Sequence, residues 1–529
     1  MRYLSFTKQP FLSYLQLTLL LAASLTITAC GFNPVTKKRE FQWISEAKEI
    51  AIGKQNYLPA RQSQGGDYII DPDLSAYISY VGKKLAAVSD RPDLPYEFVL
   101  INDSVPNAWA MPGGKIAFNR GLLYELNSEA ELAAVMGHEI VHAAARHGAK
   151  NMEHGIFLQG AMIAVGIGAQ HTDYGDLIVG GSQLGAQLLS SQYGRDAESE
   201  SDLYGMQYMK KAGYDPSAAV TLQETFVRLS EGKPSDFISG LFASHPPSPQ
   251  RVADNKITLA KIGAGGEMGK QIYAKKVAHL KATRTAYKAF DDAVAALKKG
   301  DTASAAELAK KAIAGEPREA RFQELLGDIA FTEKKTEAAL SYYAKAIKMQ
   351  PDYFKPHIQS GILLFNSGKK KEAEPYLKKA NELLPTAPGH ALLGQIAEDR
   401  GDINLALQHY QIATTSNSDI GKDANLRLIR LDFPRHPNQY LQAGVVADSR
   451  GNLFAVVQNN AAIAIEGVSV RVIQYDPESG RAISQSGSMR ILGSIAADNR
   501  GQVSTGIRIS DPQQTKFYKV SVESAKLVN

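Results

Sequence analysis

Residues 128–142 read SEAELAAVMGHEIVH, and no other stretch of the chain is as informative about its fold. Ser128 and Glu131 form the S-x-x-E pattern that begins many helices, and most of the residues that follow are apolar or strong helix formers. No proline interrupts the segment, which continues to Gly148. We therefore expect a single helix from about residue 128 to 150, buried on one face.

On such a helix His138 and His142 are four residues apart and share a face, so both imidazoles can reach one metal ion. Glu139 is offset from that face, which leaves its carboxylate off the metal and free to address water that the metal activates. This HExxH spacing is typical of zinc peptidases, which place two ligands and a general base on one turn. The pattern predicts one Zn²⁺ ion per chain.

A third protein ligand is needed, and the acidic segment 195–202 can supply it. Glu198 and Asp202 are four residues apart on a second predicted helix. One carboxylate can bind the metal while the other accepts the outer N–H of a ligand histidine. Glu200 lies two residues from each and is expected to project elsewhere. His147 is nearer in sequence, but a continuous helix turns it well away from the metal face. The alternative is an ordinary solvated helix start.

Three further stretches carry a resemblance to a known family: residues 106–116 (PNAWAMPGGKI), 198–202 (ESESD) and 244–251 (SHPPSPQR). With the HExxH pattern, they make residues 45–260 similar to the zinc metallopeptidase family that includes HtpX, the CaaX prenyl proteases and the periplasmic protease BepA. Ser201 stands where the family has alanine, a small change on a helix. The resemblance implies an α-rich (α+β), gluzincin-like metallopeptidase domain.

The resemblance also assigns roles to individual residues. It implies that the metal ligands are His138, His142 and Glu198, with Glu139 as the base and Asp202 beside the ligands. Asn107 and His245 would contact the substrate or the developing oxyanion, and Arg251 is a further candidate for this contact. The family offers His245 a second role, in which neutral imidazole occupies the open metal position as a latch. Alternatively, His245 and Arg251 only hold their proline-rich loop together.

A strand is predicted directly after Gly113 and Gly114, because residues 115–119 alternate like a half-buried strand. An edge strand beside a metal cleft can add an extended substrate through main-chain hydrogen bonds. We therefore expect Gly114, Lys115 and Ile116 to contact substrate, and unfolded polypeptide to be the substrate class.

The N-terminus has the features of a bacterial lipoprotein. Residues 1–29 resemble a signal peptide whose apolar run ends at Ile-Thr-Ala-Cys, and Cys30 is the only cysteine of the chain. We expect Cys30 to carry lipid in the periplasm of a Gram-negative bacterium, with Gly31 favouring the outer membrane. The alternative is that the apolar run stays as an uncleaved anchor. A second apolar stretch, residues 155–168, is short for a membrane span and is expected to be a core helix or a lid.

The second half of the chain contains repeats and then strands. Pro317, Pro351 and Pro385 are spaced 34 residues apart, the period of tetratricopeptide repeats. Residues 284–420 are therefore predicted to form an α-solenoid of four helix pairs whose concave face binds polypeptides. Residues 440–529 alternate like strands separated by turns, which favours a small antiparallel β-sandwich used for docking or spacing.

The composition is ordinary for a multidomain protein, with 44% hydrophobic and 21% charged residues, and a net charge of +5 argues against nucleic acid as a partner. We expect a lipid-anchored periplasmic zinc endopeptidase that degrades misfolded or stalled envelope proteins, which the repeats recruit. One alternative is an assembly factor or holdase with a latched protease, and another is a processing peptidase for one dedicated substrate. The predicted domains are a signal peptide (1–29), a metallopeptidase domain (30–275), a repeat array (284–420) and a β-sandwich (440–529).

Overall fold

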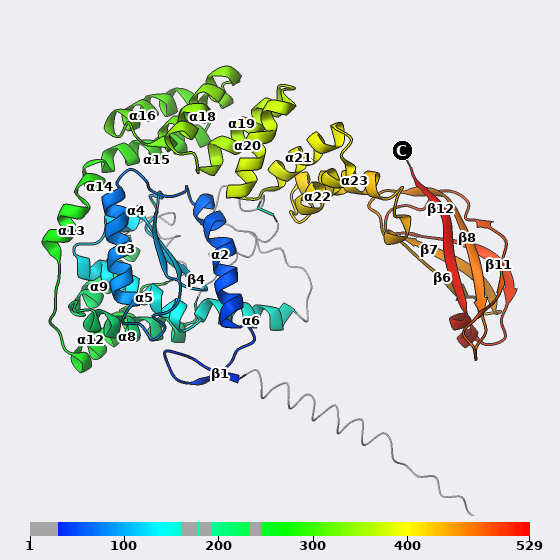
Figure 1. Cartoon of the computed structure of the whole chain (residues 1–529), viewed down its shortest axis with the longest axis horizontal. Coiled ribbons are helices and arrows are strands. Elements are labelled where there is room, and N and C mark those ends of the chain that lie inside the picture. The colour runs from blue at the N-terminus through cyan, green and yellow to red at the C-terminus, as the bar shows by residue number, and fades with distance from the viewer. Residues whose placement is uncertain (1–29, 160–177, 180–192, 233–244, 529) are drawn as a thin grey trace, which may run out of the picture. The chain divides into compact units, whose positions relative to one another are not determined.

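The structure is a computed structural model that describes residues 30–159, 178–179, 193–232 and 245–528 (Figure 1). Contacts divide the chain into two compact units, the first built mainly from residues up to Leu363 and the second mainly from residues after it. The predicted signal peptide and most of the apolar stretch 155–168 lie outside the described residues. Among the helices that are described, none is long and apolar enough to cross a membrane.

The first unit contains a three-stranded sheet in the order β3-β5-β4. Strand β5 (Lys115–Asn119) pairs in parallel with β3 (Glu97–Ile101) and antiparallel with β4 (Ala108–Met111). Every residue of β5 is buried. The prediction that β5 is a half-buried edge strand is therefore wrong, because the chain turns back at Gly113 and Gly114 and β4 covers that side.

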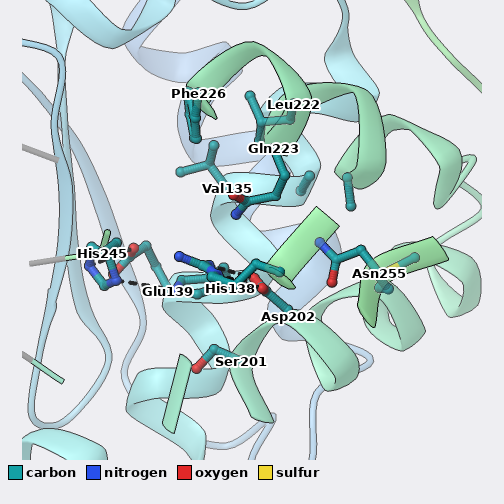
Figure 2. A pocket seen from close by; sticks show the side chains of 14 residues that line it. Val135, His138, Glu139, Ser201, Asp202, Leu222, Gln223, Phe226, His245 and Asn255 are labelled. Carbon is teal, nitrogen blue, oxygen red and sulfur yellow. Dashed lines mark hydrogen bonds and ion pairs between the residues drawn. The ribbon is translucent and has the colours of Figure 1, made fainter. Parts of the chain in front are cut away.

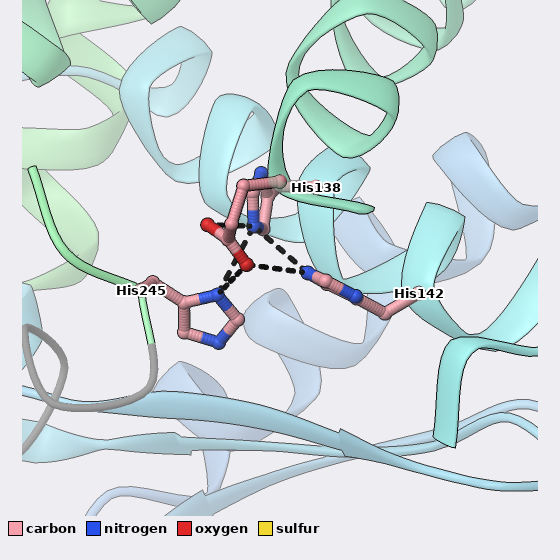
Figure 3. A group of neighbouring side chains, drawn as sticks. His138, His142 and His245 are labelled. Carbon is pink, nitrogen blue, oxygen red and sulfur yellow. Dashed lines mark hydrogen bonds and ion pairs between the residues drawn. The ribbon is translucent and has the colours of Figure 1, made fainter. Parts of the chain in front are cut away.

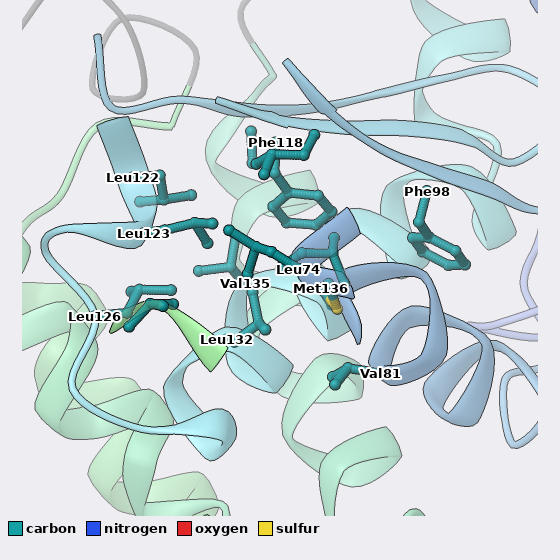
Figure 4. Packing of buried hydrophobic residues seen from close by; sticks show 14 of the residues in the cluster. Leu74, Val81, Phe98, Phe118, Leu122, Leu123, Leu126, Leu132, Val135 and Met136 are labelled. Atoms are coloured by element: carbon teal, nitrogen blue, oxygen red, sulfur yellow. The ribbon is translucent and has the colours of Figure 1, made fainter. Parts of the chain in front are cut away.

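Helices surround this sheet and place α5 (Glu129–Ala144) at the centre of the unit, with every residue of α5 buried. Figure 4 shows its apolar side chains Leu132 and Met136 among residues from the sheet and α3 (Pro72–Ala86), such as Phe118 and Leu74. The other helices of this region are α2 (Glu46–Ser63), α4 (Arg120–Leu123), α6 (His147–Gln159), α8 (Arg195–Lys211), α9 (Ser217–Gly232), α12 (Pro249–Ile262), α13 (Lys270–Lys276) and α14 (Ala278–Ala282).

The predicted helix 128–150 begins as expected but is interrupted. Ser128 caps it by accepting a hydrogen bond from the Glu131 amide at 3.1 Å. The helix ends at Ala144, and Arg146 takes a left-handed conformation with φ of 61°. The Arg146 guanidinium stabilises this break by donating to the Glu49 carboxylate at 3.0 Å. A new helix, α6, then starts at His147.

The four predicted repeat pairs are confirmed as helix pairs, followed by one further helix. A recurring close contact explains why glycine and tyrosine recur at matching positions of the repeats. Gly327 lies against the ring of Tyr343, and Gly394 lies against the ring of Tyr410. A side chain at either glycine would overlap the ring, so the pattern needs glycine there. The helices are α15 (Arg284–Lys298), α16 (Thr302–Gly315), α17 (Ala320–Thr332), α18 (Thr336–Met349), α19 (Phe354–Asn366), α20 (Lys370–Leu383), α21 (Ala387–Asp399), α22 (Ile403–Ala413) and α23 (Asp419–Asp432).

The C-terminal region consists of antiparallel strands, as the sequence predicts. One sheet has the order β11-β7-β6 and the other β10-β8-β12, with β9 also paired to β8. Alternate residues such as Val457 and Val470 form one buried core. The strands are β6 (Leu441–Ala447), β7 (Asn452–Asn459), β8 (Ile465–Tyr475), β9 (Ala482–Gln485), β10 (Met489–Arg490), β11 (Arg500–Arg508) and β12 (Tyr518–Leu527).

Candidate metal centre

Four buried side chains from three parts of the chain converge at the centre of the first unit. His138 and His142 come from α5, Glu198 from α8, and His245 from the loop before α12. Figure 3 shows ring nitrogens of His138, His142 and His245 turned toward one another, and one ligand atom from each of the four residues lies within 4.8 Å of the others. The sequence placed these residues in three separate motifs, and the fold brings the motifs together.

The spacing inside the cluster suits a single ion. The Nε2 atoms of His138 and His142 are 3.0 Å apart, and Glu198 Oε1 lies 3.3 Å from His142 Nε2. His245 Nδ1 is 2.9 Å from Glu198 Oε1, so His245 belongs to the donor set itself. Imidazole nitrogens with one carboxylate are the donors that zinc prefers, and the residues present therefore fit the ion that the motif implies.

Two glycines allow the helices that carry these ligands to approach each other closely. A Cβ atom at Gly205 of α8 would lie 3.0 Å from the His138 amide nitrogen, and one at Gly137 would lie 3.0 Å from the Gly205 carbonyl oxygen. The two backbones are therefore in direct contact next to the first histidine. This contact sets the separation between α5 and α8, and with it the distance from His138 to Glu198.

A charged network holds the outer sides of the ligands. Asp202 Oδ1 lies 2.9 Å from His138 Nδ1, as expected for a residue that orients a ligand. Arg251 donates two hydrogen bonds to Asp202, at 2.8 and 2.7 Å, and its Nη1 lies 2.9 Å from Glu198. Burial alone would raise the pKa of Asp202, but the Arg251 guanidinium lowers it. Burial alone would lower the pKa of His138, but Glu198 and Asp202 raise it to about 10.

Glu139 lies beside the cluster and not in it. Its Oε1 is 3.5 Å from His245 Nε2, and its Oε2 is buried without a hydrogen-bond partner among the described residues. Burial raises the pKa of this carboxyl above its ordinary value, while His245 opposes the shift. A buried carboxylate with one free oxygen next to a metal-binding set is placed as a general base requires.

A pocket opens next to His138 and Glu139, and it is largely apolar on one side. Figure 2 shows Leu222 and Phe226 of α9 facing Val135 of α5 across it. An apolar pocket beside a base and a metal-binding cluster suits the side chain of a bound polypeptide.

The sequence predicts that His147 is not a metal ligand, and His147 lies outside the set of four possible ligands, but the structure places it directly against the ligand His142. The break at Arg146 turns His147 back, so that its Nδ1 lies 2.9 Å from Nδ1 of the ligand His142. Its other nitrogen, Nε2, lies 3.4 Å from Glu200. Glu200 projects away from the metal cluster, as predicted, but it contacts His147, which in turn contacts the ligand His142. The sequence does not predict this contact, because a continuous helix over residues 128–150 would turn His147 away from the metal-binding face.

Tyr193 is a neighbour of the site for which no sequence pattern gave a signal. Its ring stacks on that of His142, with centroids 3.9 Å apart and planes inclined by 24°. Burial raises the pKa of its hydroxyl above the ordinary value.

The residues predicted to contact substrate differ from one another in burial and in their neighbours. Asn107 precedes β4, and its Oδ1 is buried without a hydrogen-bond partner among the described residues. The side chains of Lys115 and Ile116 are buried in the domain, where the Lys115 ammonium contacts Glu97 and donates to the Pro95 carbonyl. Gly114 occupies a tight turn with φ of 79° against Tyr96.

With this geometry established, residues 72–256 match the profile of Peptidase family M48. The chain contains an M48 peptidase domain. The profile of the tetratricopeptide repeat matches residues 290–354, which lie within the predicted array.

The M48 region of this chain is similar to several curated proteins. It is 32% identical over 232 residues to the mitochondrial metalloendopeptidase OMA1 of Schizosaccharomyces pombe, covering 42% of this chain and 65% of that protein. It is 27% identical over 246 residues to the beta-barrel assembly-enhancing protease of Escherichia coli, covering 45% of this chain and 50% of that protein. A putative beta-barrel assembly-enhancing protease of Vibrio cholerae is 31% identical over 40% of this chain and 43% of its own length. These matches therefore span between 43% and 65% of the relatives' own lengths.

The solved structures that match do so at low similarity. The crystal structure of MamA has 19% sequence identity and a TM-score of 0.23, and the match covers 27% of this chain and 85% of that one.

Proposed function

We propose that the protein is a lipid-anchored periplasmic zinc endopeptidase that cleaves unfolded, misfolded or stalled envelope proteins. The observation that carries the proposal is the convergence of His138, His142 and Glu198 with Glu139 beside them. Two histidines and a carboxylate would hold the ion, and Glu139 remains free for proton transfer. The match to Peptidase family M48 supports the same activity.

Each residue then has a defined task in peptide hydrolysis. A zinc ion, when bound, supplies Lewis acidity that activates water for attack on a carbonyl near neutral pH. Glu139 takes the proton from the attacking water and returns it to the leaving amine. Asp202 accepts the Nδ1–H hydrogen bond of His138, which leaves Nε2 as the nitrogen that would hold the ion. A donor to the developing oxyanion contributes about 2.7–4 kcal/mol, and His245, Arg251 and Asn107 are the candidates.

The position of His245 distinguishes an active peptidase from a latched chain that only binds its clients. Its Nδ1 lies among the ligand atoms, 3.2 Å from His138 Nε2, where it would fill the position that an activated water needs. We propose that this arrangement is a latched state and that His245 leaves when substrate binds. A permanently latched chain would act as an assembly factor or holdase, which is the second candidate function.

The substrate would bind as an extended strand. Within the described residues β5 is covered on both sides, whereas β4 pairs only with β5 and keeps one edge free. Helix α5 packs against β4, so this edge runs close to the catalytic helix. A strand added there is held by its main chain, which accepts many sequences and suits unfolded polypeptides. We propose β4 and Asn107 as the substrate-binding elements, in place of the main chain of Gly114, Lys115 and Ile116.

The envelope setting comes from the relatives and from the N-terminus. Two similar proteins are named as beta-barrel assembly-enhancing proteases, which favours outer-membrane barrel precursors as clients. The repeats would recruit such clients or their assembly machinery through their concave face. Cys30 would carry the lipid and place the body at the periplasmic face of the outer membrane.

A genetic experiment separates the enzyme from the holdase. A Glu139→Gln chain should fail to rescue the barrel-assembly defect of a deletion strain, while wild type rescues it at equal abundance. Full rescue by Glu139→Gln would show that binding is sufficient and would favour the holdase. A third candidate, a dedicated processing peptidase, predicts one cut site in one protein instead of many cuts in unfolded clients.

A further inference from the structure

The described chain begins with a small hairpin that exposes aromatic side chains. Strand β1 (Cys30–Phe32) pairs antiparallel with β2 (Arg39–Phe41). The exposed fractions are 60% for Phe32, 52% for Phe41 and 64% for Trp43. Three large aromatic side chains within one hairpin and the residues after it are unusual on a soluble surface, where such groups are normally scattered.

Phe32 and Phe41 lie on one face of the hairpin, and Trp43 follows two residues after its second strand. Phe41 is paired with Cys30, and Phe32 is paired with Arg39, and directly paired residues share a face of a sheet. Arg39 and Phe41 of β2, and Trp43 two residues beyond its end, are exposed, while the residues between them are half-buried. We refer to Phe32, Phe41 and Trp43 as the aromatic face. The Arg39 guanidinium lies over the Phe32 ring at 5.3 Å.

The other side of the hairpin is polar and holds it to the peptidase domain. Asn33 donates to the Ala145 carbonyl at 3.2 Å, just after the catalytic helix. Glu40 forms an ion pair with Lys150 of α6 at 2.8 Å. The buried Glu153 carboxylate accepts hydrogen bonds from the amides of Trp43 and Ile44, at 2.8 and 2.7 Å. The hairpin therefore turns polar groups inward and aromatic groups outward, the reverse of ordinary burial.

Basic residues accompany the aromatic face. Lys37, Lys38 and Arg39 are consecutive and exposed. Their acidic neighbours neutralise them weakly, since Lys37 lies 3.5 Å from Asp90 and Lys38 lies 3.6 Å from Glu200, with both lysine side chains about 70% exposed. Aromatic rings with lysine and arginine are the composition that protein surfaces use at the membrane–water interface.

We propose that the aromatic face inserts into the headgroup region of the membrane that holds the chain. This inference rests on the proposed lipid anchoring at Cys30. The lipid bilayer is the occupant we assign, because the apolar N-terminal run ends at Cys30 and Cys30 is itself paired with Phe41. The lipid tethers the chain to the bilayer, and the basic aromatic surface adds a second contact with the same bilayer. The tight hairpin contacts then fix how the peptidase domain faces the bilayer.

Fluorescence can test this directly, because the chain has two tryptophans in opposite environments. Trp43 is 64% exposed and Trp109 is 5% exposed. The full chain would be reconstituted into vesicles of phosphatidylethanolamine and phosphatidylglycerol, with and without lipids brominated near the headgroup. Acrylamide quenching from the water side and bromine quenching from the lipid side would be compared with the chain in detergent. The Trp43→Phe variant keeps an aromatic ring and isolates the signal of Trp109.

The proposal predicts that vesicles protect Trp43 from acrylamide severalfold and that shallow bromine quenches it, with both effects lost in Trp43→Phe. A Phe32→Ser/Phe41→Ser chain should stay bound through its lipid but regain acrylamide quenching of Trp43. The matched control, Ile483→Ser/Leu492→Ser, removes two exposed apolar side chains of the C-terminal region and should behave as wild type.

Three results would overturn the inference. A chain that floats with the vesicles but leaves Trp43 open to acrylamide is anchored without using the aromatic face. Protection from acrylamide without bromine quenching means that protein, such as a second copy, covers the face. A chain that does not float with vesicles at all refutes the lipid anchor and the aromatic face together, and it leaves the peptidase proposal untouched.

Discussion

Nδ1 of His142 lies 2.9 Å from Nδ1 of His147, a residue five positions further along the chain. The contact exists because Arg146 adopts a left-handed conformation between the two helices. With Nε2 of His142 directed at the metal-binding cluster, the only other ring nitrogen is held by His147, whose own Nε2 faces Glu200 at 3.4 Å. The ligand is thus oriented from its outer side, as Asp202 orients His138.

Replacing His147 should therefore weaken metal binding without unfolding the protein. Outer partners of ligand histidines typically contribute a factor of about 10–100 in metal affinity, and we expect a loss in this range for His147→Ala. Competition between the purified chain and a chromophoric chelator measures the zinc affinity. His436→Ala, at a half-exposed histidine outside the peptidase domain, is the matched control. An unchanged affinity in a folded His147→Ala chain would show that the contact does not orient the ligand.

The contact between Gly137 and Gly205 gives a second prediction. Gly205→Ala places a methyl group 3.0 Å from the His138 amide nitrogen, so α8 must move away from α5. The shift separates Glu198 from His138, and we expect a loss of at least about tenfold in zinc affinity with a stability loss of roughly 1–3 kcal/mol.

Gly194→Ala provides the control for this change. Gly194 caps the N-terminus of the same helix α8, has ordinary backbone angles, and has nothing within 4 Å of its added Cβ position. Zinc affinity and urea denaturation of both variants would be measured side by side. Equal behaviour of the two variants would contradict the view that the backbone contact sets the ligand spacing.

A pair of histidines in the repeats predicts a dependence of stability on pH. His390 Nδ1 lies 3.0 Å from His409 Nδ1, and burial lowers the pKa of His390 to about 4. The pKa of a histidine in the unfolded chain is about 6.5, so below that pH the unfolded state binds more protons than the folded state. The folded state is then destabilised as the pH falls from about 6.5 to about 4, by up to roughly 3 kcal/mol.

The His390→Gln variant removes this group and should lose part of the acid sensitivity. Melting temperatures of wild type and His390→Gln would be compared across this pH range in the same buffers. We expect the melting temperature of wild type to fall more steeply than that of the variant. Parallel curves would mean that His390 is not held neutral by the fold.

The sequence predicted the parts of the site that follow from local periodicity. His138, Glu139 and His142 lie on one helical turn, and Glu198 and Asp202 on another, so spacing alone indicated their shared faces. The repeats could also be predicted from the sequence. Gly327 contacts Tyr343 and Gly394 contacts Tyr410 in the same way, and residues that make the same contact in each repeat recur at a regular spacing.

What the sequence did not predict depends on backbone breaks and on strand order. Left-handed residues are usually glycine or asparagine, and Arg146 is neither. The sequence therefore did not predict the turn that brings His147 against His142. Strand β5 was predicted at an edge because its pairing with β3 and β4 is a matter of topology, which alternation does not encode. Tyr193 stacks on His142 from a segment with no motif of its own.

The most direct test of the central claim is hydrolysis of an unfolded protein such as casein by the full chain in detergent. Wild type, Glu139→Gln and His245→Ala would be assayed together, with the zinc content of each measured. We expect cleavage by wild type, because His245 leaves the cluster when substrate binds, and faster cleavage by His245→Ala, which has no latch. Glu139→Gln should lose at least about 100-fold in rate while keeping its zinc, because it lacks the base. Undiminished cleavage by Glu139→Gln, or no cleavage by any zinc-loaded chain, would contradict the account.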